Sequence, residues 1–226
     1  MFDDCNTIST ILDAEFKRLC AEFNVDTENC HFGLATERVI YLALYKRVWA
    51  FKNIITAQDL MYNIVNADYG ADESIFINYV FAVMANGKLD QWAFLTVANL
   101  WELLYKQKCV GATDEEAIEY LKQSLRHEVG HMIANQKIFD ENGIEEGSKI
   151  FKDLKKKQDR AWKRYITRKD FDFDSLDEKG IRAYYVKYHN LPFEKAANEA
   201  VGLTAKEMAE AEVVFWKRRR NLDGTQ

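Results

Sequence analysis

Residues 113–137 read TDEEAIEYLKQSLRHEVGHMIANQK, and this stretch decides how the chain folds. Its apolar residues recur every three or four positions, the spacing typical of one face of an amphipathic helix. They are Ile118, Leu121, Leu125, Val129 and Met132. Thr113, followed by Glu116, has the pattern of a capping box at a helix start. The stretch therefore predicts a long helix with one side packed in the core.

The same helix carries the motif His127-Glu128-Val129-Gly130-His131, which uses two of the four histidines in the chain. Residues i and i+4 lie on one helical face, so His127 and His131 can bind one metal ion. A catalytic zinc ion takes three protein ligands and keeps one position for water, whose proton it loosens. Glu128 is the expected general base, which takes that proton and returns it to the leaving amine. The motif indicates a zinc hydrolase; the alternative is two structural histidines.

The surroundings of the motif favour a metal site. Ser124 and Ala134 lie one turn to either side of the histidines and leave room for a metal ion and a substrate. Gly130 costs the helix about 1 kcal/mol relative to alanine. We therefore expect another backbone to approach the helix at Gly130.

A third ligand must come from downstream, and the first option lies in residues 191–200, LPFEKAANEA. Glu194, Ala197 and Asn198 match a Glu-x-x-Ala-Asn pattern. This stretch resembles the second ligand helix of metallopeptidases of the gluzincin and ImmA/IrrE types. The resemblance implies a zincin-like two-helix metal site with His127, His131 and Glu194 as ligands. A glutamate in the first turn of a helix is also stabilised by the helix dipole.

The second option is Glu146, which is followed by Gly147 and Phe151. This arrangement is similar to that around the third histidine of SprT-like metalloproteases, with glutamate in place of histidine. His189 and Glu199 are further candidates, and Glu199 could instead orient a ligand histidine.

Three tyrosines precede Glu194 closely in the sequence and could stabilise an oxyanion. They are Tyr184, Tyr185 and Tyr188.

The resemblance has two departures. His131 and Glu194 are far apart in the sequence, so the predicted helix over 145–166 must be an insertion between the ligand helices. The sheet that aligns a peptide in zincins is also not evident before the motif. Short strands are conceivable only at 30–34 and 171–173.

Composition favours a globular protein of the cytoplasm. Hydrophobic residues make up 48% of the 226 residues, enough for a sizeable core. The four cysteines form no CxxC pair and are expected to be reduced thiols. The start of the chain is acidic and unlike a secretory signal. No apolar run approaches the roughly 20 residues of a membrane span, so no membrane partner is expected.

The charge is unevenly distributed. The chain has a net charge of −5, whereas residues 151–226 carry 18 Lys and Arg against 13 Asp and Glu. Their basic run over 152–169 includes Trp162 and Tyr165, a composition that suits nucleic-acid contact. Asp153 and Asp159 dilute the run, so a solvated helical face is the favoured interpretation.

Helical spacing predominates elsewhere, and the sequence predicts a mainly α fold with at most a small β element. We expect an N-terminal helical region over 1–110 and a metal-binding helical region over 111–226, or one domain comprising both. The other predicted helices cover 7–23, 37–51, 57–66, 72–85, 89–106, a stretch from about 175, 194–201 and 204–220.

The expected function is that of a zinc-dependent metallopeptidase acting on a protein or peptide substrate. The alternative is a non-catalytic binding or structural protein, such as a phage or mobile-element accessory factor, working through its basic helix. A zinc hydrolase with a different substrate is the third reading.

Overall fold

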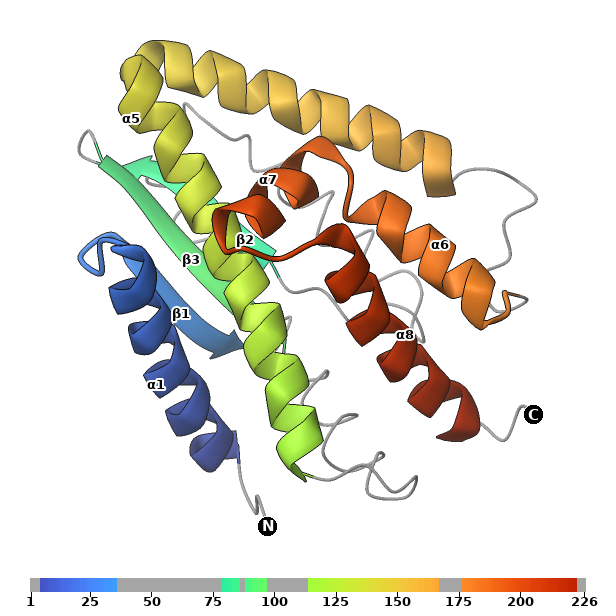
Figure 1. The fold of residues 1–226 in the computed structure, drawn as a ribbon. Helices are drawn as coiled ribbons and strands as arrows, with labels where there is room; N and C mark the ends of the chain where they lie inside the picture. The colour runs from blue at the N-terminus through green and yellow to red at the C-terminus, as the bar shows by residue number, and fades with distance from the viewer. Residues whose placement is uncertain (1–4, 36–78, 86–87, 97–113, 167–175, 223–226) are drawn as a thin grey trace. The chain divides into compact units, whose positions relative to one another are not determined.

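The computed structural model describes residues 5–35, 79–85, 88–96, 114–166 and 176–222 (Figure 1). Helices predominate among these residues, so the prediction of a mainly α fold is confirmed. The chain forms two compact units, residues 1–128 and 129–226. The domain boundary expected at residue 110 lies outside the described residues, as do the predicted helices over 37–51 and 57–66.

Helix α1, Cys5–Phe23, corresponds to the helix predicted over 7–23. Leu12, Phe16 and Leu19 form its buried face. Asn24 ends the helix with a positive φ of 54°, and the amide of Val25 donates to the carbonyl of Cys20 at 2.8 Å. This is the hydrogen bond of a Schellman motif, which satisfies a carbonyl of the last helical turn.

A three-stranded sheet follows in the order β1-β3-β2. Strand β1, Cys30–Ala35, runs parallel to β3, Lys88–Thr96, with Cys30 opposite Gln91. Strand β2, Tyr79–Ala85, pairs antiparallel with β3. Phe16 of α1 stacks on Phe32 of β1 with ring centroids 5.8 Å apart, so α1 packs against the sheet.

The sheet confirms one prediction and corrects two. A strand does occur at the expected place near residues 30–34. The helices predicted over 72–85 and 89–106 are wrong in their described parts, which form β2 and β3. A short apolar run such as β2, YVFAVMA, cannot be assigned to helix or strand by spacing alone. The strand predicted at 171–173 and the capping box at Thr113 lie outside the described residues.

Helix α5, Asp114–Ile166, contains the motif and is broken at Gly143, whose φ and ψ are 69° and 177°. This conformation is essentially restricted to glycine. The break separates a first segment of α5, residues 114–142, from a second segment, residues 144–166, which runs in a different direction (Figure 1). The sequence predicts these segments as separate helices over 113–137 and 145–166.

Three shorter helices complete the chain: α6, Glu178–Tyr188; α7, Pro192–Ala200; and α8, Ala205–Leu222. The predicted capping box of α8 is confirmed, because the Glu207 amide donates to Thr204 Oγ1 at 3.2 Å and the Thr204 amide donates to the Glu207 carboxylate at 2.8 Å. Arg182 of α6 binds both carboxylate oxygens of Glu210 on α8, at 2.7 and 3.0 Å. No described helix is both long and apolar enough to cross a membrane.

Candidate metal centre

The first segment of α5 presents both motif histidines one helical turn apart. The apolar stripe that predicts this helix is buried throughout, from Ile118, 7% exposed, to Met132, 0% exposed. Burial of the stripe fixes the rotation of the helix about its axis. His127 is consequently buried, and His131 is partly buried.

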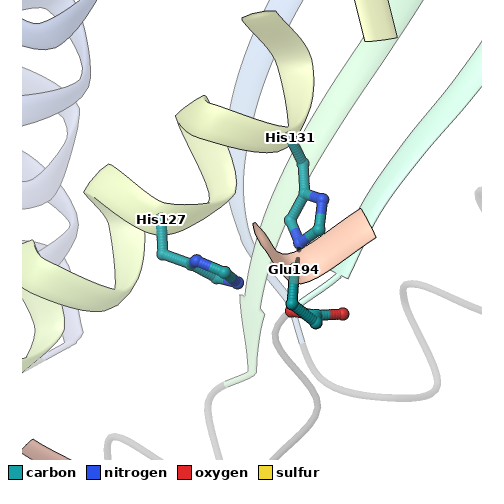
Figure 2. Close-up of side chains that lie close together, drawn as sticks. All are labelled: His127, His131 and Glu194. Atoms are coloured by element: carbon teal, nitrogen blue, oxygen red, sulfur yellow. Dashed lines mark ion pairs between the residues drawn. The ribbon is translucent and has the colours of Figure 1, made fainter. Parts of the chain in front are cut away.

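Helix α7 supplies the third side chain. Pro192 occupies the first helical position, where its fixed φ favours a helix start, and Glu194 lies in the first turn. Glu194 is buried, and its Oε2 lies 3.5 Å from Nε2 of His131. Figure 2 shows this carboxylate directed at the His131 ring, with His127 one turn earlier on α5. One ligand atom from each of the three residues lies within 4.8 Å of the others.

The cluster fits a zinc ion in its donors and, for one pair, in its distance. Two histidine nitrogens and one carboxylate oxygen form a ligand set found in catalytic zinc sites. With bonds of about 2.1 Å and tetrahedral angles, two ligand atoms lie about 3.4 Å apart. The 3.5 Å between His131 and Glu194 agrees with that spacing. The most distant pair, at up to 4.8 Å, must draw together when an ion binds.

Gly130 explains why α7 can lie so close to α5. A Cβ atom added at Gly130 would be 2.1 Å from the backbone oxygen of Ala197, well inside contact distance. The close backbone approach expected at Gly130 is therefore confirmed. Ala197 follows Glu194 by about one turn of α7, so the same approach sets the distance between Glu194 and the histidines.

Glu128, the expected general base, lies on α5 between the two histidines. The residue is buried, with 4% of its surface exposed. Burial of a carboxylate is costly unless it is compensated, and such positions are common at functional sites.

An aromatic chain connects the cluster to the second segment of α5. The Phe193 ring lies 6.5 Å from the His131 ring and 5.5 Å, edge-on, from the Phe151 ring. Phe151 in turn lies 6.2 Å from Phe139 of the first segment. Through these ring contacts the start of α7 packs against the second segment of α5.

Gln158, which sequence reasoning missed, contacts the start of α7 directly. Its Nε2 donates to Glu194 Oε1 at 3.2 Å, and its Oε1 accepts from the Phe193 amide at 3.3 Å. The sequence offers no signal for this role, since Gln158 follows three consecutive lysines and reads as part of a solvated face.

The other proposed ligands lie outside the cluster. Glu146 has a side chain 57% exposed and pairs with Lys149 at 3.2 Å. Glu199 is 66% exposed and pairs with Lys195 at 3.7 Å, so it faces solvent rather than orienting a histidine. His189 is buried at the end of α6. Among the described residues, the group of His, Cys, Asp and Glu that could hold a metal is His127, His131 and Glu194.

The three tyrosines proposed as oxyanion donors lie on α6. Tyr184 and Tyr185 are in edge contact at 5.2 Å, and Tyr188 packs edge-on against His189 at 4.9 Å. Burial, together with the negative charge of Glu212, raises the pKa of Tyr184 to about 12. Tyr184 therefore remains protonated at neutral pH and keeps its hydroxyl donor.

The structure describes the side chains of two cysteines, Cys20 and Cys30, and neither of them forms a disulfide. Cys20 and Cys30 are buried free thiols. Burial raises the pKa of Cys20 to about 11 and that of Cys30 to about 12. Both are therefore protonated at neutral pH.

The comparisons with known proteins found no relative of this chain. No protein-family model matches the chain, and no match was found among the curated proteins or the solved structures.

Proposed function

We propose that the chain is a zinc-dependent metallopeptidase in which His127, His131 and Glu194 hold the ion and Glu128 acts as general base. The observation that carries this proposal is the convergence of three ligand atoms within 4.8 Å, with a buried glutamate between the two histidines in sequence. The resemblance of both motifs to gluzincins and ImmA/IrrE-type metallopeptidases supports the same assignment.

The donor set suits hydrolysis. A zinc ion held by three protein ligands would act as a Lewis acid toward a carbonyl and make water more acidic. Among the three ligands only Glu194 contributes a negative charge, so a zinc ion held by them would keep a net positive charge and would favour a developing oxyanion. Glu128 takes the proton of the attacking water and passes it to the leaving amine. Tyr184, Tyr185 or Tyr188 supplies a hydroxyl donor to the oxyanion.

The proposed substrate is a protein or peptide, and the proposed compartment is the cytoplasm. The free thiols Cys20 and Cys30 are consistent with a reducing compartment.

Metal analysis together with a cleavage assay tests the proposal. We expect about one zinc per chain for the wild type, reduced occupancy for His127→Ala and His131→Ala, and full occupancy for Glu128→Gln. A diverse peptide library read by mass spectrometry should be cleaved by the wild type, and roughly 100- to 10,000-fold more slowly by Glu128→Gln. Glu146→Ala is the control, because its exposed carboxylate lies outside the cluster and should affect neither measurement.

Two results would contradict the proposal. A wild type that holds no zinc after reconstitution has no metal centre of this kind. A zinc-loaded wild type that cleaves the library no faster than Glu128→Gln is not a peptidase of this mechanism.

The second candidate function is a non-catalytic binding protein, such as a phage or mobile-element accessory factor. The observation that favours it is the exposure of four basic residues on the second segment of α5: Lys152, Lys156, Lys157 and Arg160. Binding to duplex DNA that weakens steeply with salt and persists in His127→Ala would support this candidate.

A further inference from the structure

We infer that Gln158 is a positioning residue for the proposed metal centre, which holds Glu194 so that one carboxylate oxygen faces His131. The inference rests on the proposed metal site and not on peptide hydrolysis. It concerns contacts within residues 129–226 only: the second segment of α5, the first turn of α7 and His131.

The orientation of the Gln158 side-chain amide is determined by its partners. The backbone N–H of Phe193 can only donate, so it must face the amide oxygen, and the distance is 3.3 Å. The amide NH2 group then faces Glu194 Oε1 at 3.2 Å, where an ionised carboxylate can only accept. Exchanging the amide oxygen and nitrogen would break both contacts at once.

Gln158 also supplies what the start of α7 lacks. The first amides of a helix have no partner within the helix and are commonly satisfied by a side chain at the N-cap. The N-cap of α7 is Leu191, which makes no side-chain cap, and Pro192 has no amide hydrogen. Gln158 accepts the next amide, that of Phe193, from another part of the chain. It therefore anchors the turn that carries Glu194.

The two oxygens of Glu194 have different environments as a result. Oε1 accepts from Gln158 at 3.2 Å, whereas Oε2 lies 3.5 Å from His131 Nε2. Glu194 is buried, so few solvent contacts compete with these two. The hydrogen bond to Oε1 restricts rotation of the carboxylate and leaves Oε2 as the oxygen available to a metal ion.

Helical geometry accounts for the position of Gln158. Phe151, Leu154 and Gln158 are spaced by three and four residues and share one face of the second segment. Phe151 meets Phe193 edge-on at 5.5 Å, which aligns this face with the start of α7. Lys156 and Lys157 are exposed. The basic segment thus has an inner face directed at the ligand helix and an outer face in solvent.

Zinc affinity in a mutant cycle tests the inference. We expect Gln158→Met, which keeps side-chain volume but removes both polar contacts, to weaken zinc binding about 10- to 100-fold, the usual effect of losing a partner of a metal ligand. In a Glu194→Ala background the same substitution should change the affinity less than about threefold, because the residue on which Gln158 acts is absent. A purely structural role for Gln158 would give equal losses in both backgrounds. Affinity is measured by competition with a chromophoric chelator.

Two further variants secure the result. Gln136→Ala is the matched control, since Gln136 is a glutamine of the first segment of α5 that binds exposed Asp140 and should leave zinc affinity unchanged. Gln158→Asn keeps the amide and a polar surface but is one methylene shorter. It should fold even if Gln158→Met does not, and should still lose at least tenfold in affinity.

The outcomes separate this inference from the proposed function. Wild-type affinity in both Gln158 variants, or equal losses with and without Glu194, overturns the positioning role and leaves the peptidase proposal intact. The predicted losses in a protein that cleaves no peptide uphold the positioning role and overturn the peptidase. Absence of zinc from the unaltered chain overturns both.

Discussion

Replacing Gly130 by alanine should separate the two effects that this glycine has on the protein. In an isolated helix the change is favourable, by about 1 kcal/mol, because alanine has the higher helix propensity. In this fold the new methyl group would be 2.1 Å from the backbone oxygen of Ala197. The two effects have opposite signs, so a measurement can decide between them.

The size of the effect follows from that distance. Ordinary contact begins at about 3.4 Å, so α7 must withdraw by roughly 1.3 Å from α5. Overpacking of this kind usually costs about 1–3 kcal/mol, which equals or exceeds the gain in propensity of about 1 kcal/mol. Withdrawal would also lengthen the 3.5 Å distance between His131 and Glu194 by as much as roughly 1.3 Å, so this pair, which already has the spacing of two zinc ligands, would also have to draw together before an ion binds.

We therefore expect the zinc-free Gly130→Ala protein to lose about 0–2 kcal/mol of unfolding free energy in urea denaturation, the overpacking cost less the gain in helix propensity. Its zinc affinity, measured by chelator competition, should fall at least about tenfold. Adding Ala197→Gly is an informative control. The atom in conflict is a backbone carbonyl oxygen, so removing the Ala197 side chain should restore neither property.

An alanine variant that is more stable than wild type and binds zinc equally well would refute this reasoning. It would mean that helix propensity outweighs the contact and that α7 does not rest on α5 at Gly130.

Three further predictions concern stability. Thr204→Ala should cost about 1 kcal/mol in urea denaturation, because Thr204 Oγ1 accepts the Glu207 amide; an unchanged midpoint would exclude the cap. Gly143→Ala should cost about 1–3 kcal/mol in the same assay, since alanine is strained at a φ of 69° and a ψ of 177°; wild-type stability would contradict the break in α5. Tyr184, with its pKa raised from 10.0 to about 12, should make the fold lose stability as pH rises from 10, because the unfolded tyrosine ionises first. Tyr184→Phe should avoid about 1 kcal/mol of the loss between pH 10 and 11, and parallel pH curves for the two proteins would rule this out.

The helical part of the fold is largely predictable because its apolar spacing is undisturbed. The stripe from Ile118 to Met132 predicts the first segment of α5 and the face that it buries. The break at Gly143 divides α5 into two segments, and these correspond to the two separate helices that the sequence predicts.

The sheet is harder to predict because its strongest strand signal is masked by a polar residue. In β3 the buried residues alternate as Leu89, Gln91 and Ala93, but the middle one is a glutamine. Gln91 is fully buried, and its Nε2 contacts Cys30 Sγ at 3.8 Å. Tertiary packing therefore accommodates a glutamine at a position where the alternating strand pattern calls for an apolar residue. The sequence does contain one local signal for a hairpin that the helix predictions overlooked. The dipeptide Asn86-Gly87 is typical of the turn between two antiparallel strands.

The candidate site likewise has a part that the sequence predicts and a part that it does not. His127, His131 and Glu194 belong to short motifs whose chemistry is legible in the sequence, and the structure brings them together. Gln158 belongs to no motif. Its contact with Glu194 spans 36 positions in the sequence and depends on how the second segment of α5 packs against α7. Such contacts arise from tertiary structure and leave no local pattern.

A crystal structure of the zinc-loaded protein, with anomalous data collected on both sides of the zinc edge, tests the central claim most directly. We expect one anomalous peak about 2.0–2.2 Å from a nitrogen of His127, a nitrogen of His131 and an oxygen of Glu194. A peak bound by Glu146 in place of Glu194, or no peak at the two histidines, would contradict it.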